Sequence, residues 1–162
     1  MPQVNVPDEK QTRLQRRIDV LLRVDNFMST LTDLDQLLEQ IMRESQSVTD
    51  AAASSLALFD ERSREFVFHV VLGEKGDATK KIRINYNEGI IGHVAQTGVS
   101  ENIRDAYADP RFSPRADQAT GFTTRSILAV PMIRRDRLIG VIEVLNKKNG
   151  GFFSDEDRSI LE

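Results

Sequence analysis

Apolar positions in the first fifty residues recur at helical spacing and predict two helices. The first is expected over residues 8–31, where the apolar stripe is interrupted by Asp25. The second is expected to follow Thr32, a candidate N-cap with Asp35 three residues further on. Its apolar side chains share one face, which favours a core helix lying on a sheet: Leu34, Leu37, Leu38, Ile41, Met42 and Val48. Residues 1–7, with two prolines and no pattern, are expected to be a disordered arm.

From Ala53 onwards the apolar pattern changes to runs typical of β-strands. The two most apolar runs are joined by the basic turn Arg134–Arg137, which is interpreted as a solvated hairpin tip. The strands are expected at residues 53–59, 66–72, 81–84, 127–133 and 138–145. Residues 73–79 are expected to form a polar, glycine-containing loop.

Between the third and fourth expected strands, Gly89 to Gln96 is interpreted as a short helix bracketed by glycines. Residues 98–125 follow without a long period and are expected to be loop with helical turns, a length that usually signals function or disorder. Ser154, with Asp157 at the capping-box position, predicts a terminal helix. The order of elements predicts an α+β fold: an antiparallel sheet of about six strands, with the N- and C-terminal helices on one face and the loop and short helix over the other.

Composition narrows the class of protein. The chain has 162 residues, 22 basic and 25 acidic, giving a net charge of −3 that favours neither nucleic acid nor an anionic membrane. It has no cysteine, which suits a cytoplasmic protein. No signal-peptide core is present, and no apolar run reaches the roughly 18 residues of a membrane span. A cytoplasmic domain without nucleic-acid or membrane partners is expected.

Catalytic and metal-binding patterns find no support. No cysteine, Gly-x-Ser-x-Gly elbow or Walker A sequence is present, and no pair of carboxylates stands out as a general acid and base. The histidines are His69 and His93, and neither has a second ligand at zinc spacing. The sequence therefore predicts neither an enzyme nor a metal site. Binding remains, and Gly89 and Gly92 are compatible either with an anion at the helix start or with tight packing alone.

Several motifs in order make a more specific signal than any one of them. Gly89-Ile90-Ile91-Gly92-His93 is followed by Asp109-Pro110-Arg111-Phe112, then by Thr120-Gly121-Phe122-Thr123-Thr124-Arg125, and the series closes with Asn146-Lys147, Phe153 and Asp157. This order resembles a GAF domain, the small-molecule sensing module of signalling proteins. It is most similar to the GAF domains in front of cyclic-nucleotide phosphodiesterases and bacterial adenylyl cyclases. The resemblance places the GAF domain at residues 32–162.

The resemblance implies a ligand site. In cyclic-nucleotide-binding relatives the phosphate lies at the start of the short helix, against backbone at the positions of Ile90 and Ser113. The positions that contact base and ribose match Ser55, Ile91, Asp117, Thr120, Thr124 and Glu143. Asn146, Lys147, Phe153 and Asp157 match a structural signature in which Lys147 and Asp157 tie the last strand to the terminal helix. Arg158 replaces the glutamate that ends this signature in relatives.

Two departures bear on the ligand. Guanine-binding relatives carry a stacking aromatic and an accepting aspartate at the positions of Val71 and Leu72, which can neither stack nor accept. Ile91 is also bulkier than the usual alanine. A guanine base bound in this pocket would leave its hydrogen-bond donors unpaired. Cyclic AMP is therefore favoured over cyclic GMP as the ligand. A ligandless dimerisation or scaffold module, with the pocket filled by its own side chains, is the alternative.

The terminal segments suggest how a GAF domain of this type signals. The apolar stripe of residues 8–31 is expected to pair with a second copy, giving a parallel homodimer through the terminal helices. Ile160-Leu161-Glu162 carries no helix stop signal, so the last helix is expected to continue to a C-terminal output domain.

Free methionine sulfoxide reductases of GAF fold use cysteines for catalysis. This chain has no cysteine, so that activity is not expected.

Overall fold

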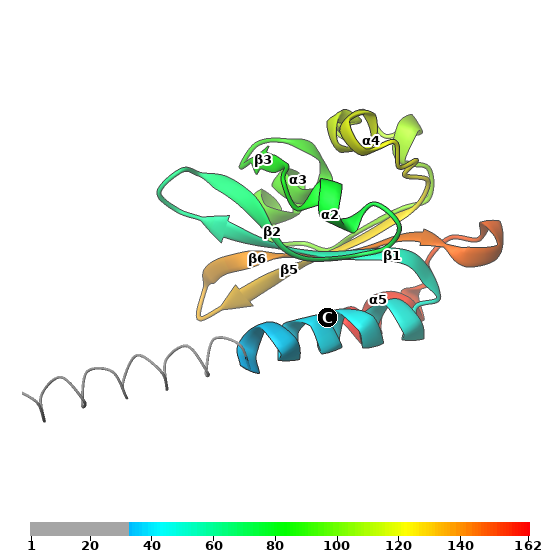
Figure 1. Cartoon of the computed structure of the whole chain (residues 1–162), viewed down its shortest axis with the longest axis horizontal. Helices are drawn as coiled ribbons and strands as arrows, with labels where there is room; N and C mark the ends of the chain where they lie inside the picture. The colour runs from blue at the N-terminus through cyan, green and yellow to red at the C-terminus, as the bar shows by residue number, and fades with distance from the viewer. Residues whose placement is uncertain (1–32) are drawn as a thin grey trace, which may run out of the picture. The chain divides into compact units, whose positions relative to one another are not determined.

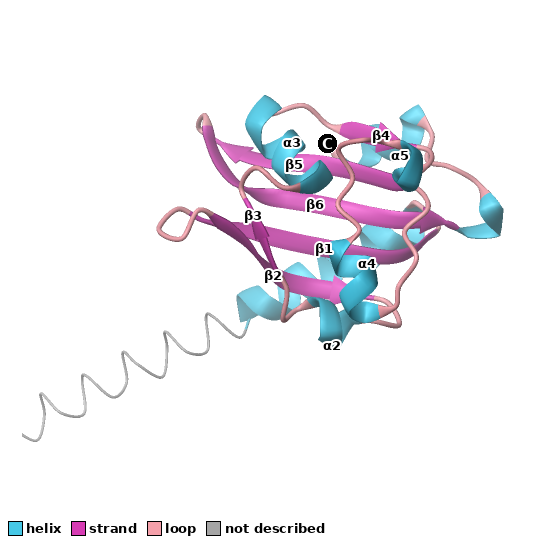
Figure 2. Ribbon diagram, turned by 90° about the horizontal axis from the view of Figure 1, so that it is seen from above, coloured by secondary structure: helices cyan, strands magenta, loops and turns pink. Residues whose placement is uncertain are grey.

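A computed structural model describes residues 33–162, and a six-stranded antiparallel sheet forms its centre (Figures 1 and 2). The strand order is β3-β2-β1-β6-β5-β4. The strands are β1 Ala51–Asp60, β2 Glu65–Leu72, β3 Arg83–Asn85, β4 Glu101–Ile103, β5 Ile127–Arg134 and β6 Arg137–Lys147. β1 pairs with both β2 and β6, so the two halves of the sequence meet at the middle of the sheet. The predicted α+β class is confirmed.

Helices cover the two faces of the sheet differently. Residues 39–48 and α5 (Asp155–Leu161) lie on one face (Figure 1). The helices α2 (Gly76–Thr79), α3 (Gly89–Thr97) and α4 (Arg115–Thr120) lie over the other, as the view from above shows (Figure 2). Residues 33–38 are also helical, but they belong to a different compact unit from Glu39–Glu162. The predicted arm at 1–7, the helix at 8–31 and the Thr32 cap lie outside the described residues.

The helix over residues 39–48 faces the sheet with fewer residues than its pattern predicted. Met42 is fully buried, and the hydroxyl of Ser54 donates to its carbonyl oxygen over 3.4 Å. Ile41 and Val48, by contrast, are 44% and 53% exposed. Successive helical residues point about 100° apart, so a stripe of this width wraps beyond the line of contact with the sheet. The expectation of one buried face is therefore wrong for Ile41 and Val48.

Three short elements differ from the sequence prediction. β4 lies inside the segment expected to be loop, and α2 lies inside the expected loop at 73–79. β3 begins at Arg83, two residues later than the predicted strand at 81–84. These elements have only three or four residues, too few for a period to be visible. β4 is a strand because its backbone pairs with β5, with Asn102 opposite Leu128.

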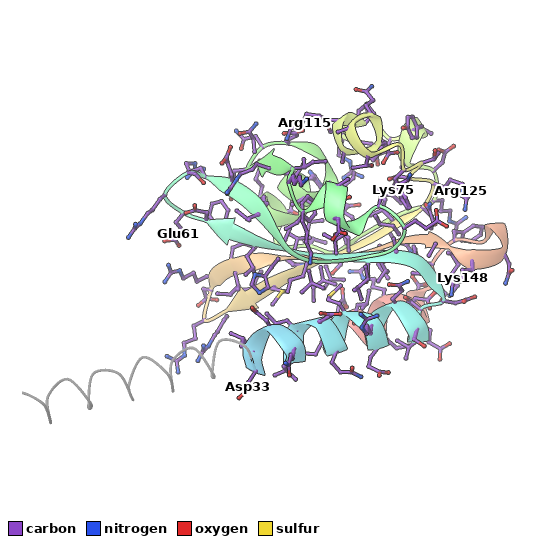
Figure 3. The ribbon with its side chains drawn as sticks, viewed as in Figure 1. Asp33, Glu61, Lys75, Arg115, Arg125 and Lys148 are labelled. Atoms are coloured by element: carbon purple, nitrogen blue, oxygen red, sulfur yellow. The ribbon has the colours of Figure 1, made fainter. Side chains whose placement is uncertain are left out.

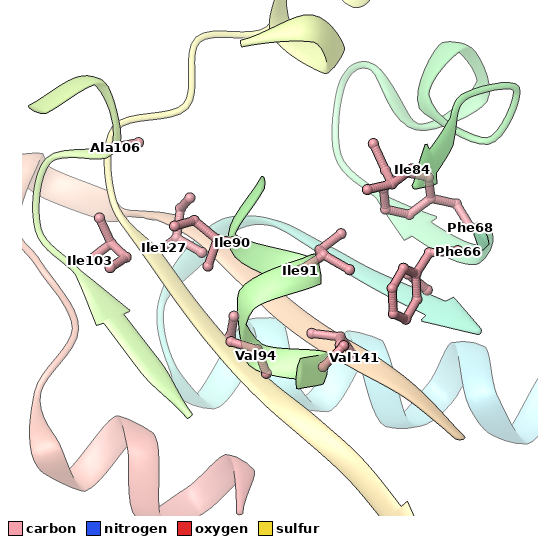
Figure 4. Packing of buried hydrophobic residues seen from close by; sticks show 13 residues of the cluster. Phe66, Phe68, Ile84, Ile90, Ile91, Val94, Ile103, Ala106, Ile127 and Val141 are labelled. Atoms are coloured by element: carbon pink, nitrogen blue, oxygen red, sulfur yellow. The ribbon is translucent and has the colours of Figure 1, made fainter. Parts of the chain in front are cut away.

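The hydrophobic core under α3 fixes the helix against the sheet. Ile90, Ile91 and Val94 are buried and are directed towards sheet residues that include Ile127 and Val141 (Figure 4). Burying each such side chain contributes about 1.5–3 kcal/mol relative to exposure. α3 is bracketed by glycines as predicted, with the C-cap Gly98 in the left-handed conformation at φ 65°.

Gly92 of α3 is explained by packing. A Cβ at this position would lie 2.7 Å from the carbonyl oxygen of Tyr86 and 2.9 Å from the carbonyl carbon of Asn87. The helix can therefore approach the turn after β3 only where a side chain is absent. Gly89 has a different reason, because its φ of 69° lies in the left-handed region.

Candidate ligand-binding pocket

A pocket lies between the sheet and the short helices α2, α3 and α4. It holds a cavity of about 100 Å³, well above the roughly 10–15 Å³ that one water needs. Its wall is mostly apolar and includes Ile84, Ile127 and Leu145. The structure brings together around it all ten residues that the resemblance nominated: Ser55, Val71, Leu72, Ile90, Ile91, Ser113, Asp117, Thr120, Thr124 and Glu143.

The floor of the pocket carries a buried polar pair from the two central strands. Ser55 of β1 stands directly opposite Glu143 of β6, and its hydroxyl donates to Oε2 of the carboxyl group over 3.2 Å. Ser55 is 2% exposed and Glu143 7%. Burial raises the pKa of Glu143 to about 7, although the hydrogen bond from Ser55 opposes the rise. Glu143 lines the pocket, and its Oε1 accepts no hydrogen bond from residues 33–162.

Asp117 and Thr124 bind one another rather than standing free. Asp117 Oδ1 accepts from the Thr124 hydroxyl over 2.7 Å, and Oδ2 accepts from the Thr124 backbone N–H over 2.7 Å. Oδ2 also accepts from the hydroxyl of Tyr107 over 3.0 Å, which raises the pKa of Tyr107. Thr120 is likewise engaged, donating to the carbonyl oxygen of Ala116 over 2.8 Å. These bonds fasten the segment after α4 across the pocket.

The start of α3 forms another side of the pocket. Gly89, Ile90 and Ile91 line it, and they supply the first backbone N–H groups of a nine-residue helix. The N-cap Glu88 sits beside them, and its Oε1 lies 3.0 Å from the Ser113 hydroxyl and 2.9 Å from Nε of Arg115. A carboxylate at a helix start is stabilised by the helix dipole. An anionic ligand here would share this region with Glu88.

Further lining residues were missed from the sequence. They include the aromatic residues Phe68, Phe112 and Phe122 and the basic residue Lys75. Lys75 and Arg115 lie on the side of the sheet that carries α4 (Figure 3). Phe112 and Phe122 belong to the Asp109–Phe112 and Thr120–Arg125 motifs, and an aromatic residue in an otherwise polar segment is the signal that marks both of them. Phe68 lies three positions before Val71 on β2 and gave no such signal.

The Asn146-Lys147 pair connects the pocket segment to the last helix. Asn146 adopts a left-handed φ of 57°. Its Oδ1 accepts from the backbone N–H of Arg125 over 2.6 Å, and its Nδ2 donates to the carbonyl oxygen of Thr123 over 2.8 Å. Lys147 Nζ lies 2.9 Å from Asp157 Oδ2, at the start of α5. Asn146 thus holds the segment beside Thr124, and the next residue, Lys147, holds the terminal helix.

The start of α5 is tightly organised. Ser154 and Asp157 form the predicted capping box. Burial disfavours ionisation of Asp157, but hydrogen bonds from Lys147 and Ser154 outweigh burial and lower the pKa of this carboxyl. Phe153 is 2% exposed, and its ring centroid lies 5.8 Å from Lys147 Nζ.

A profile of the GAF domain family matches residues 33–162. The chain belongs to the GAF domain family. Its relatives include the probable 3′,5′-cyclic phosphodiesterase pde-5 of Caenorhabditis elegans, which is 35% identical over 137 residues. That match covers 78% of this chain but 19% of the relative, so this GAF domain spans about a fifth of the relative's length.

Solved structures support the GAF fold. The GAF domain of a phosphoenolpyruvate-protein phosphotransferase from Coxiella burnetii matches with a TM-score of 0.71 and 22% identity, covering 89% of this chain and 84% of that one. The free methionine-R-sulfoxide reductase of Neisseria meningitidis, solved with its substrate, matches with a TM-score of 0.65 and 20% identity, covering 99% and 89% of the two chains. Within residues 33–162 of the GAF domain, no helix has the length and apolar character to cross a membrane. The same residues contain no cluster of three or more histidines and carboxylates placed to hold a metal ion.

Proposed function

We propose that this GAF domain is a regulatory sensor that binds a small molecule in the pocket, with a cyclic nucleotide as the ligand. The observation that carries the proposal is the buried Ser55–Glu143 pair on the pocket floor, in which one carboxyl oxygen has no hydrogen-bond partner among residues 33–162. A carboxyl oxygen beside a cavity takes its hydrogen-bond partner from a ligand or water. The relative named as a cyclic phosphodiesterase supports the nucleotide as ligand.

The ends of the pocket suit the two ends of a nucleotide. The backbone N–H groups at the start of α3 favour the phosphate, next to Ile90 and Ser113. Lys75 supplies a basic side chain among the residues that line the pocket. The base then lies over the sheet, near Glu143.

Adenine is preferred over guanine in this proposal. Val71 and Leu72 line the pocket at the end of β2 and offer no acceptor. Because Oε2 of Glu143 is bound to Ser55, a single carboxyl oxygen is open to the ligand. One open oxygen suits the single exocyclic amino group of adenine, whereas guanine presents two adjacent donors that call for both oxygens.

The bound state is transmitted through the Asn146-Lys147 pair. A ligand that changes the segment from Thr123 to Ser126 acts on Asn146, whose amide holds that segment. Lys147 is the next residue and holds Asp157 of α5. In the proposal α5 passes the change to a C-terminal output domain, and the domain acts in the cytoplasm as a homodimer through its terminal helices. The domain is not itself an enzyme in this account.

A ligandless scaffold is the second candidate, and one observation favours it. Asp117, Thr124 and Tyr107 satisfy one another's hydrogen bonds, so the segment after α4 is closed without a ligand. The cavity and the open oxygen of Glu143 favour the sensor, because a scaffold pocket filled by its own side chains has neither.

Thermal unfolding in the presence of a metabolite panel separates the two candidates. A ligand of the folded state alone stabilises it by about 2.7 kcal/mol at a hundredfold excess over its dissociation constant. For a domain of this size the melting temperature should rise by several degrees. The sensor predicts such a rise with cyclic AMP. No rise with any cyclic nucleotide at millimolar concentration would favour the scaffold.

A further inference from the structure

Phe122 differs from the other aromatic residues that line the pocket. Phe68 is 8% exposed and belongs to the hydrophobic core cluster. Phe112 packs against the same cluster, and its ring is tilted against Tyr107 at a centroid distance of 5.1 Å. Phe122 is half-buried, lines the pocket and belongs to neither cluster of the described core. No ring contact of Phe122 is found within residues 33–162.

The backbone on both sides of Phe122 is anchored. Gly121 ends α4 in the left-handed conformation at φ 72°, a position that favours glycine. The Phe122 backbone N–H donates to Thr120 Oγ1 over 3.2 Å, and two residues later Thr124 is bound to Asp117. A side chain between two such anchors is placed by its backbone rather than by core packing. Its ring is therefore held at the pocket without being needed to fill the core.

We propose that Phe122 is the stacking residue of the pocket and that the ligand presents a flat, nitrogen-containing ring between Phe122 and the sheet. The segment after α4 supplies one surface for the ring, and Ser55 and Glu143 supply polar groups for the hydrogen-bonding atoms of the ring. This supplies the aromatic face that Val71 and Leu72 of β2 cannot. The inference rests on the proposed function, because it assigns a role within the same pocket.

The competing explanation is that Phe122 only plugs a dry pocket. A plug requires apolar volume, which leucine also supplies, whereas stacking requires a flat π face. Leucine and tyrosine at this position therefore separate the two roles. In the stacking role Phe122→Leu weakens ligand binding about tenfold, while Phe122→Tyr binds within about twofold of wild type.

The chain contains no tryptophan, so Phe122→Trp places a single tryptophan at the pocket, which can be excited apart from the two tyrosines. Phe152→Trp is the matched control, because Phe152 is 51% exposed and its ring lies against Arg104 at 4.2 Å, before α5. Each variant is titrated with adenosine 3′,5′-cyclic monophosphate, and wild type, Phe122→Leu and Phe122→Tyr are measured by calorimetry. Circular dichroism checks that each variant folds.

Stacking predicts a saturable fluorescence change in the Phe122→Trp variant, none in the Phe152→Trp variant, and the tenfold loss in Phe122→Leu. Wild-type binding combined with an unchanged Phe122→Trp signal, or with Phe122→Leu binding as wild type, overturns the role of Phe122 and leaves the proposed function standing. If Phe122→Trp does not fold, the leucine and tyrosine variants decide. Absence of binding to the wild-type domain overturns both the role of Phe122 and cyclic-AMP sensing.

Discussion

Thr124 is joined to Asp117 by two hydrogen bonds of 2.7 Å, one from its backbone N–H and one from its hydroxyl. Both residues are at least nine-tenths buried, with Asp117 at 6% and Thr124 at 5% exposure. A carboxylate that accepts two short hydrogen bonds from one residue fixes the direction of the chain there. The pair therefore closes the segment between α4 and β5 over the pocket before any ligand binds.

Thr124→Ala tests this closure. The change removes the hydroxyl donor and leaves Asp117 Oδ1 without a partner, which should lower the free energy of unfolding by about 1–2 kcal/mol. It should also weaken cyclic-AMP binding, because the segment that carries Phe122 is less firmly held. Urea unfolding and calorimetry measure the two effects. Thr123→Ala is the matched control, since the Thr123 side chain is exposed and should change neither quantity.

Lys147→Ala tests the connection to α5. The side chain of Asp157 is 7% exposed and that of Lys147 23%, so the pair is shielded on one side only. Asp157 keeps its hydrogen bonds with Ser154 in the variant. The expected loss is about 1–3 kcal/mol in the free energy of unfolding, between the values for exposed and buried pairs. A double-mutant cycle with Asp157→Ala measures the coupling, and zero coupling would refute a structural role for the pair.

Glu143→Gln tests the buried carboxyl through the pH dependence of stability. Burial raises the pKa of Glu143 from its ordinary 4.5 to about 7 in the folded domain. The unfolded chain then loses this proton at lower pH than the folded chain, so wild type is destabilised as pH rises from about 4.5 to 7. The difference of about 2.5 pKa units corresponds to about 3 kcal/mol.

Glu143→Gln should therefore exceed wild type in free energy of unfolding by up to about 3 kcal/mol at pH 8, and match it near pH 4. Asp117, Glu74, Glu88 and Lys75 also line the pocket and are present in both proteins, so the two proteins differ only at position 143. Urea unfolding at both pH values measures the difference. A difference that does not change between pH 4 and pH 8 would rule out a raised pKa for Glu143.

The homodimer is tested with the terminal helices present. Light scattering of the 162-residue chain should give the mass of two chains, whereas a variant that lacks residues 1–31 should shift towards one. Ile41 and Val48 leave an apolar surface on the helix over residues 39–48, so Ile41→Glu should weaken the dimer. A monomer at high concentration, with residues 8–31 shown to be helical, would contradict this prediction.

The sequence predicted the fold well because the long helices and strands have a clear periodicity of apolar residues. β1, β2, β5 and β6 are strands of eight or more residues, and α3 is marked by glycines at both ends. β4 and α2 escaped prediction because β4 is formed by pairing with β5, and α2 is placed by contacts with α4 and β2, rather than by their own pattern. Ile41 and Val48 were assigned to the core because a wide apolar stripe does not reveal how much of it meets the sheet.

The motifs predicted which positions line the candidate site, but not which side chains bind one another there. The ten residues line one pocket, yet the sequence held no information on which polar groups bind each other. The Thr124 position was expected to contact base or ribose, but the Thr124 hydroxyl donates its hydrogen bond to Asp117. The open oxygen of Glu143 depends on the strand register that sets Ser55 opposite it. Such pairings join residues far apart in sequence and need the folded chain.

Calorimetric titration of the wild-type domain with cyclic AMP and cyclic GMP tests the central claim most directly. We expect saturable binding of one nucleotide per chain. Cyclic AMP should bind more tightly than cyclic GMP, because one carboxyl oxygen of Glu143 is open and Val71 and Leu72 offer no acceptor. Tighter binding of cyclic GMP would contradict the assignment of Val71 and Leu72. No heat from either nucleotide at millimolar concentration would contradict cyclic-nucleotide sensing itself.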